Sequence, residues 1–191
     1  MIDILIATHN PHKLKEFRTL LEPIGYHVIG ADEVGLPDIE ETGTTFRENS
    51  ALKATHAAQF SNMLSLADDS GLCVHALNNE PGIFSARYAA QNGGYPKVFD
   101  VLLTRLTDDF SAHFNCCLCL AKPGKEPLFF EGQVQGHLTQ KADTSCSNFG
   151  FDPIFIPDGY DKTFGGLPPE VKNKISHRAR ALEKLVAYLK G

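Results

Sequence analysis

The sequence lacks the features that would place it in a membrane or on a nucleic acid. No apolar run reaches the length of about 18 residues that a membrane-spanning helix needs. The opening stretch MIDILIATHN has neither the basic start nor the long apolar middle of a signal peptide. The chain carries 18 basic and 23 acidic residues, a formal net charge of −5, whereas binders of nucleic acids or anionic membranes are usually basic. We therefore expect a cytoplasmic protein that binds neither a membrane nor a nucleic acid. A small anionic substrate is still possible, because a pocket needs only a few local cations to bind one.

Cysteine is present, but its pattern fits neither a disulfide framework nor a zinc site. The cysteines are odd in number and three of them crowd the segment NCCLCL; the five stand at Cys73, Cys116, Cys117, Cys119 and Cys146. No second pair of cysteine or histidine residues lies at the spacing that zinc ligands need. In a strand, Cys117 and Cys119 would share one side and Cys116 the other. We expect buried free thiols in a reducing compartment.

The composition is that of a globular protein with a sizeable core. Hydrophobic residues make up 42% of the 191 positions and charged residues 21%, which is typical of folded domains and not of disordered chains. The sequence shows no internal repeat, no low-complexity tract and no linker. A chain of this length is ordinary for one domain, so we predict a single domain over residues 1–191.

Short apolar segments alternate with helical patterns early in the chain, and two long β-prone segments dominate later. Strands are predicted at residues 2–7, 27–31, 63–69, 72–77, 112–122 and 126–139, the last two as an antiparallel hairpin around the sequence PGK. Helices are predicted near residues 13–21, 45–60 and 95–107 and, as an amphipathic segment, at the carboxyl-terminal end. Thr44 or Thr45 is the predicted N-cap of the second of these helices. This order predicts an α/β protein with a mixed sheet.

The loop THNPHK, Thr8 to Lys13, joins the first predicted strand to the first predicted helix. Backbone N–H groups and the positive end of the helix dipole favour an anion there, while Thr8 and Asn10 can donate hydrogen bonds and Lys13 adds a cation. The glycines of a P-loop are missing. Two interpretations therefore stay open: a phosphate-binding loop, or an ordinary loop in which Asn10 or His12 caps the helix.

Two adjacent aspartates, Asp68 and Asp69, follow the apolar segment LSLA and precede Ser70 and Gly71. We expect them at the carboxyl end of a buried strand, where α/β folds bind ligands. Adjacent carboxylates are tolerated when a cation lies beside them, and hard oxygen ligands suit Mg²⁺, which also binds substrate phosphates. The alternative is a turn in which one aspartate caps and the other is solvated. A phosphoryl transfer to aspartate is disfavoured because the arrangement D-x-D-x-[TV] is absent.

Four further segments carry residues suited to catalysis or binding, and each also has a simpler structural interpretation. The segment IEETG can be a solvated acidic loop. In FRENSALKA the residues Glu48, Asn49 and Lys53 lie near one face of the predicted helix, but Glu48, Leu52 and Lys53 can simply be helix surface and core filler. The segment NFGFDPIF can sandwich a purine ring or contribute core aromatics. The basic cluster near the carboxyl terminus can bind a polyanion or merely begin a solvated helix; its members are Lys172, Lys174, His177 and Arg178.

Five segments together resemble the inosine triphosphate pyrophosphatase family, whose members hydrolyse non-standard purine nucleoside triphosphates. They are ATHNPHKLKEF at 7–17, EETGTTFRENSALKA at 40–54, ADDSGLCVHALNNEPGIFSARYA at 67–89, FGFDPIF at 149–155 and KISHRARAL at 174–182. Their order and spacing match along essentially the whole chain. The resemblance implies a mixed central sheet with two α/β lobes and an active-site cleft between them. It also implies a homodimer and a Mg²⁺-dependent reaction that converts XTP, ITP or dITP to the monophosphate and pyrophosphate.

The resemblance also implies roles by position. Glu40 and Asp69 match carboxylates associated with the metal, and Asp69 also matches the proton acceptor, with Asp68 and Lys53 as further catalytic residues. The matching substrate-binding residues are Thr8, His9, Asn10, Lys13, Ser70, Phe149, Gly150, Phe151, Asp152, Lys172, His177 and Arg178. Lysine side chains among these would neutralise the leaving pyrophosphate.

The chain departs from the family pattern at a few positions. Asn148 stands where the family usually has glycine, and Phe151 stands where it usually has tyrosine, which removes a phenolic hydroxyl; the segment after Thr163 differs as well. These departures bear on the base preference and leave the carboxylates untouched. Two other functions stay open at this point: a related pyrophosphatase for pyrimidine or methylated nucleotides, and a nucleotide-binding module without turnover.

Overall fold

The structure, a computed structural model, describes residues 2–143 and 149–191. The chain forms two compact units: unit 1 combines Met1–Asp69, Cys117–Glu131 and Ala181–Gly191, and unit 2 combines Ser70–Cys116 and Gly132–Arg180. Cys146 and Asn148, both named above, lie outside the described residues. The two units agree with the two expected lobes, whereas the single functional domain over 1–191 and the cleft between the lobes stay predictions.

Three parallel strands form the centre of unit 1. Strand β1 (Ile2–Ile6) pairs in parallel with β2 (Tyr26–Gly30) and with the start of β3 (Leu64–Val74). The side chains of Ile4–Ile6 are fully buried, as expected for a short apolar run in a parallel sheet that is covered on both faces.

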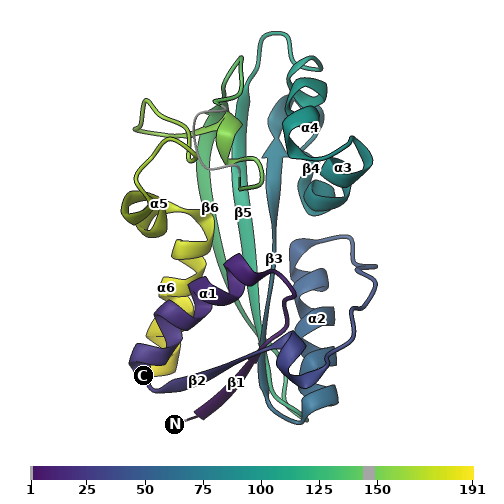
Figure 1. The fold of residues 1–191 in the computed structure, drawn as a ribbon, viewed down its shortest axis with the longest axis vertical. Coiled ribbons are helices and arrows are strands. Elements are labelled where there is room, and N and C mark those ends of the chain that lie inside the picture. Colours follow the sequence, from purple (N-terminus) through teal and green to yellow (C-terminus); the bar gives the residue numbers. More distant parts are fainter. Residues whose placement is uncertain (1, 144–148) are drawn as a thin grey trace. The chain divides into compact units, whose positions relative to one another are not determined.

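Two helices of unit 1 begin at polar caps that the sequence already suggests. Helix α1 (Pro11–Leu21) starts after Asn10, and helix α2 (Phe46–Ser61) starts after Thr45, whose hydroxyl accepts the N–H of Glu48. Figure 1 shows α1 and α2 on the two sides of β3. Two short 3-10 helices complete this part of the chain: η1 (Glu22–Ile24) and η2 (Ala31–Val34).

One continuous strand replaces the two strands predicted at 63–69 and 72–77. Strand β3 runs without a break from Leu64 to Val74, so Asp68 and Asp69 lie inside a strand and not in a turn at its end. The prediction was wrong because Asp, Ser and Gly are typical turn residues. Pairing at both ends overrides that tendency, since β3 is hydrogen-bonded to β1 near Leu64 and to β4 (Glu80–Pro81) near Val74.

Unit 2 packs its strands and helices around an aromatic core. Strand β4 pairs antiparallel with the end of β3, and β7 pairs antiparallel with β6. The rings of Phe114, Phe155 and Phe164 lie in contact at the centre of the core. The elements that belong wholly or partly to this unit are η3 (His75–Leu77), η4 (Gly82–Phe84), α3 (Ser85–Gln91), α4 (Tyr95–Leu103), β5 (Ser111–Ala121), β6 (Leu128–Leu138), η5 (Asp152–Ile154), β7 (Phe155–Pro157), α5 (Pro169–Ile175) and α6 (His177–Lys190).

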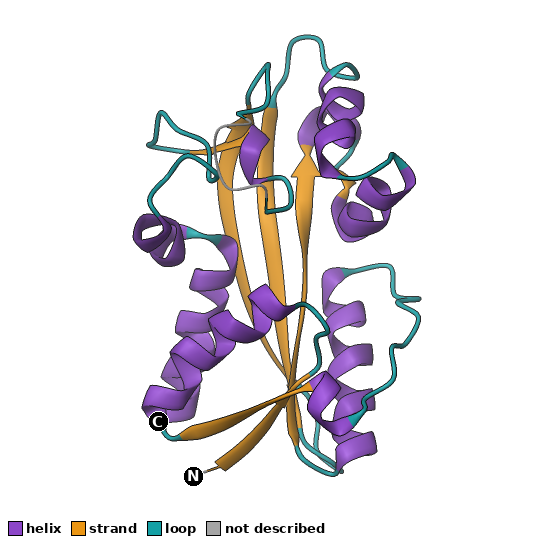
Figure 2. Ribbon diagram, in the orientation of Figure 1, coloured by secondary structure: helices purple, strands orange, loops and turns teal. Residues whose placement is uncertain are grey.

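The described strands form a mixed sheet, as predicted. They are hydrogen-bonded in the order β2-β1-β3-β5-β6-β7, with β4 paired to β3, and both parallel and antiparallel pairs occur. Strands β5 and β6 are neighbours joined by a short connection, which confirms the predicted hairpin (Figure 2). The four described cysteines are buried and free, also as predicted. Within residues 2–143 and 149–191, no helix is both long and apolar enough to span a membrane.

Within unit 2, Gly71 allows β3 to pass close to the backbone at Gly82. A Cβ atom at this position would lie 2.1 Å from the carbonyl oxygen of Gly82 and 2.6 Å from Oγ of Ser85. We expect Gly71→Ala to lower the free energy of unfolding by about 1–3 kcal/mol, the usual cost of overpacking, as measured by urea denaturation. Gly191→Ala is the control, because its Cβ would meet nothing nearer than 3.7 Å; equal stability of the two variants would contradict the prediction.

Candidate active site

Strand geometry explains how two adjacent aspartates are tolerated in the core of unit 1. Only 4% of Asp68 and 6% of Asp69 is exposed. Successive side chains of a strand point to opposite faces, so each carboxylate meets a different helix. The Nζ atom of Lys13 in α1 donates to Oδ1 of Asp68 at 2.6 Å, and Nζ of Lys53 in α2 lies 3.7 Å from Oδ1 of Asp69. Each aspartate thus has its own cation, and the pair is held apart by the pleat of the strand.

The loop before α1 bears out the cap interpretation, while the phosphate-binding interpretation stays a prediction. Oδ1 of Asn10 accepts the backbone N–H groups of His12 and Lys13 at 3.0 and 3.3 Å, so Asn10 is the helix cap. Two of the helix's free N–H groups are therefore already satisfied. Anion binding here would depend on Nζ of Lys13, the amide of Asn10 and the hydroxyl of Thr8.

His9 lies in the same loop between two exposed carboxylates. Its Nδ1 lies 2.6 Å from Oδ1 of Asp32, and its Nε2 lies 3.2 Å from Oδ1 of Asp38. Both ring nitrogens are thus engaged by the protein, which ties the loop to η2 and to the segment that follows it. Direct contact of His9 with substrate stays a prediction that this arrangement does not favour.

Lys53 sits between two carboxylates and joins them. Its Nζ donates to Oε1 of Glu41 at 2.5 Å and faces Asp69. Burial lowers the pKa of Lys53, but the charges of Asp69, Asp68 and Glu41 outweigh it, so the net pKa is raised. Lys53 is therefore a fixed cation at the centre of the cluster.

Asp69 is the carboxylate in this cluster whose charge is hardest to maintain. Burial raises its pKa from 3.8 to about 6; Lys53 opposes the rise, Glu41 and Asp68 add to it, and the Asn49 side chain lowers it. The Oδ2 atom of Asp69 is buried and has no hydrogen-bond partner among the described residues. A buried carboxylate with an unused oxygen and a pKa near neutrality is suited to accept a proton or to bind a cation.

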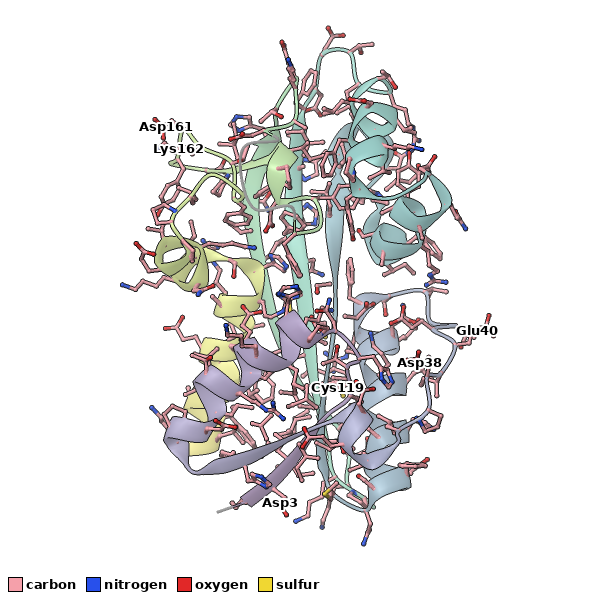
Figure 3. The ribbon with its side chains drawn as sticks, in the orientation of Figure 1. Asp3, Asp38, Glu40, Cys119, Asp161 and Lys162 are labelled. Atoms are coloured by element: carbon pink, nitrogen blue, oxygen red, sulfur yellow. The ribbon has the colours of Figure 1, made fainter. Side chains whose placement is uncertain are left out.

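Glu41, and not Glu40, is the glutamate that reaches this cluster. Glu40 is exposed, and Figure 3 shows it on the outer side of its loop, pointing away from α2. Glu41 is partly buried and bonds to Lys53. The sequence could not separate two adjacent glutamates in a loop, because the choice depends on which one the backbone turns toward α2. The predicted metal role of Glu40 therefore has no support in its position.

The cluster suits a cation that takes few protein ligands. Among the described residues, no group of three or more His, Cys, Asp or Glu side chains is arranged to hold a metal ion. The unpartnered Oδ2 of Asp69 is a hard oxygen donor. The carboxylates of Glu41 and Asp68 are further oxygen donors in the cluster, since both act on the same Lys53. Mg²⁺ commonly binds one or two carboxylates and completes its shell with water and phosphate oxygens, so the donor set fits that ion.

In unit 2 the predicted binding residues form a second group of contacts. Lys172 donates to Oδ2 of Asp152, and its Nζ lies 5.1 Å from the ring centre of Phe149. The guanidinium of Arg178 donates to Oγ of Ser70 at 3.3 Å. These contacts bring together residues that are far apart in the sequence and that the resemblance assigned to substrate.

Other predicted residues of unit 2 have structural partners. Phe151 is only 2% exposed, and its ring packs edge-on against Tyr95 at 5.2 Å, so the core interpretation holds for this ring. The ring of His177 stacks on Phe114 at 4.7 Å. Gly150 has φ +60°, a conformation that glycine adopts at no steric cost, and thereby turns the chain between Phe149 and Phe151.

Comparison with known proteins decides the family. The sequence pattern of the Ham1 family matches residues 4–188. The chain belongs to the Ham1 family. This Ham1 chain is 43% identical over 196 aligned positions to a protein of Bacillus subtilis named dITP/XTP pyrophosphatase, with 100% of the chain and 98% of the relative covered.

Solved Ham1 structures agree with the fold. A HAM1 protein from Coxiella burnetii matches with a TM-score of 0.93 at 39% identity, covering 100% of this chain and 99% of that one. The Ham1 protein of Staphylococcus aureus matches with a TM-score of 0.90 at 42% identity, covering 99% and 98%. The family resemblance and the mixed α/β fold are thereby confirmed for this Ham1 chain.

Two residues of the candidate site, Glu41 and Asn49, went unassigned in the sequence analysis. Glu41 was passed over for its neighbour, and Asn49 was noted only as one of three residues near a helix face. A usable signal was present for Asn49, since it lies four residues before Lys53 and such residues are neighbours on a helix. Its full burial depends on tertiary packing and could not be read from the sequence.

Proposed function

We propose that this chain is a nucleoside triphosphate pyrophosphatase that hydrolyses non-standard purine nucleotides, namely dITP, ITP and XTP, to the monophosphate and pyrophosphate. The observation that carries the proposal is the buried cluster of Lys53, Glu41 and Asp69 next to the Lys13–Asp68 pair. Cleavage between the α- and β-phosphates needs a base for water and cations for the leaving group, and the cluster holds both. The name of the Bacillus subtilis relative, which matches over the full chain, supports the same activity.

Each residue of the cluster has a chemical task in this proposal. Asp69 accepts a proton from the attacking water, for which a pKa of about 6 is better suited than that of an exposed aspartate. Lys13 and Lys53 stabilise the negative charge that develops on the leaving pyrophosphate. Asp69 together with Glu41 would hold Mg²⁺, which supplies charge neutralisation to the phosphate oxygens when bound.

Base selection is assigned to unit 2. Phe149 offers an aromatic face, and Lys172 and Arg178 offer donors that suit the 6-oxo group of hypoxanthine or xanthine. Adenine presents a donor at that position, so a buried donor of the protein would lose its partner. Such a mismatch costs about 1–3 kcal/mol, roughly a 5- to 150-fold loss in specificity.

The surroundings of the enzyme are also part of the proposal. We expect a cytoplasmic homodimer that acts on free nucleotides, with neither a nucleic acid polymer nor a membrane as partner. The net charge of −5 supports the absence of polyanion binding. Light scattering coupled to gel filtration would give the mass of the assembly, and a mass of 21.0 kDa, that of one chain, would exclude the dimer.

A nucleotide panel tests the substrate class. Initial rates of pyrophosphate release are compared for dITP, ITP, XTP, dATP, dGTP and dTTP, with Mg²⁺ and with EDTA. We expect dITP, ITP and XTP to exceed dATP at least about tenfold in kcat/KM, and EDTA to abolish turnover of all six. A preference for dTTP would overturn the purine assignment in favour of the related pyrophosphatase for pyrimidine nucleotides.

Lys13→Ala is expected to weaken substrate binding more than it slows the chemical step. The side chain lies in the first turn of α1 and carries the cation assigned to the triphosphate. We expect KM for dITP to rise about 10- to 100-fold, as for a lost charged hydrogen bond, in steady-state kinetics corrected for the folded fraction. Lys15→Ala, an exposed lysine of the same helix, is the control. An unchanged KM for Lys13→Ala would show that the triphosphate does not bind at this loop.

A further inference from the structure

Asn49 is a fully buried amide whose two ends have different environments. It lies in α2, one turn before Lys53, with 0% of its surface exposed. Its Oδ1 accepts the backbone N–H of Gly43 at 2.8 Å. Its Nδ2 is buried without a hydrogen-bond partner among the described residues. A buried donor without a partner is destabilising, so its presence requires a reason beyond packing.

Asn49 and Asp69 each leave one buried polar atom unused, and the helix of Asn49 reaches Asp69: Lys53, one turn after Asn49 on α2, lies 3.7 Å from Oδ1 of Asp69. The Asn49 side chain lowers the pKa of Asp69, as an amide N–H beside a carboxylate does. Oδ2 of Asp69 is in turn buried without a partner in the described part of the chain. Two buried polar atoms of complementary type, one on α2 and one on β3, thus belong to the cluster around Lys53.

The acceptor end of Asn49 holds the loop that carries Glu41. A Cβ atom on Gly43 would lie 2.6 Å from Oδ1 of Asn49 and 2.7 Å from Cβ of Glu48, so the glycine is needed for this close approach. Glu48 makes a separate contact, since its Oε2 accepts the N–H of Thr44 at 2.6 Å. Lys53 of α2 also holds this loop through Glu41. The loop is therefore tied to α2 through Lys53, Asn49 and Glu48, and the first two of these side chains also act on Asp69.

We propose that Asn49 is a positioning residue that couples the Glu41 loop to Asp69: its oxygen anchors Gly43 while its N–H group orients Oδ2 of the carboxylate. The inference rests on the proposed function for the role of Asp69 in turnover. The orientation of Asp69 itself is a structural property and does not depend on which substrate the enzyme takes.

The decisive variant is Asn49→Asp, which keeps the size of the side chain and an acceptor for Gly43 but replaces the donor by an oxygen. We expect kcat for dITP to fall about 100-fold or more while KM changes less than about threefold. Glu48→Ala is the matched control, because it removes a different tie of the loop, the one to Thr44, and the described contacts of Glu48 do not include Asp69. It should keep kcat within about threefold of wild type. If Asn49 only anchors the loop, Asn49→Asp will match wild type, and this result would overturn the proposal.

A second measurement needs neither turnover nor substrate. In EDTA at pH 8, Asn49→Asp should lower Tm by about 4 °C or more, because two carboxylates then face each other; in the Asp69→Asn background the same change should lower Tm by less than about 1 °C. Equal shifts in both backgrounds would refute the contact even in an active enzyme. If the proposed function fails instead, the Tm cycle still reports on the Asn49–Asp69 pair. Should Asn49→Asp not fold, Asn49→Ala replaces it in both measurements, and equality with Glu48→Ala in kcat would then be the contradicting result.

Discussion

Asp69→Asn is expected to lower kcat for dITP by about 1,000-fold or more while the protein still folds. The substitution removes the proton acceptor and the main oxygen donor for the cation at almost constant volume, and general-base catalysis alone contributes about 100- to 10,000-fold. The measurement is single-turnover pyrophosphate release, with circular dichroism to show that the fold is kept. Asp3→Asn is the control, since Asp3 is an exposed residue of β1 that pairs only with His27 among the described residues (Figure 3). A wild-type rate for Asp69→Asn would remove Asp69 from the mechanism.

The same variant is expected to be more stable than wild type at high pH in the absence of metal. Burial raises the pKa of Asp69 from 3.8 to about 6. Between about pH 4 and pH 6, Asp69 therefore holds its proton in the folded state but has released it in the unfolded state. Stability therefore falls as pH rises from about 4 to 6, and the cost of the charge is complete above pH 6. This cost of the buried charge to the free energy of unfolding is no more than about 3 kcal/mol.

Urea denaturation in EDTA checks the stability gain of Asp69→Asn. We expect the free energy of unfolding of the variant to exceed that of wild type by up to about 3 kcal/mol at pH 8. Most of this advantage should be lost at pH 3.5, where Asp69 of wild type is mostly protonated in the unfolded state as well as in the folded state. A difference in the free energy of unfolding that stays constant from pH 3.5 to 8 would mean that the burial of Asp69 carries no such cost.

Lys53→Met is the second variant with a large expected effect. Lys53 is the cation that neutralises both Glu41 and Asp69. The ion pair with Glu41 is partly exposed: 19% of the Lys53 side chain and 28% of the Glu41 side chain are accessible to solvent. Removing one partner of a buried ion pair leaves an uncompensated charge, which costs about 3–5 kcal/mol when burial is complete. We expect about 2–4 kcal/mol here because of the partial exposure, together with loss of turnover.

Denaturation of four variants separates the charge effect from lost packing. Lys53→Met combined with Asp69→Asn should recover part of the lost stability, because one of the two unpaired carboxylates is then gone. Lys15→Met, an exposed lysine of α1, should stay within about 0.5 kcal/mol of wild type. No recovery in the double variant would show that Lys53 stabilises the unit by packing and not by its charge.

The fold was predictable where a local pattern and the sheet agreed. Apolar runs predicted β1 and the long hairpin of β5 and β6. Polar residues predicted where α1 and α2 begin, and the observed caps Asn10 and Thr45 were each one of two candidates. The break between residues 69 and 72 was predicted wrongly because local turn preference was given more weight than pairing along the whole of β3. Pairing is a long-range effect that no short window of sequence contains.

The candidate site was predictable in its charges but not in its orientations. Asp68 and Asp69 were singled out because adjacent carboxylates after an apolar run are rare. Lys53 was singled out by its place near one helix face and by the family resemblance. The choice between Glu40 and Glu41 and the burial of Asn49 depend on how one loop lies on α2. Phe151 was assigned to substrate by resemblance, although its ring lies in the core of unit 2.

The products of dITP hydrolysis test the central claim most directly. Wild-type protein is incubated with dITP and Mg²⁺, and the phosphorus-containing products are identified by ³¹P nuclear magnetic resonance. We predict dIMP and pyrophosphate in equal amounts, with no dIDP at any time. Formation of dIDP and inorganic phosphate, or binding of dITP without any product, would contradict cleavage between the α- and β-phosphates by this chain.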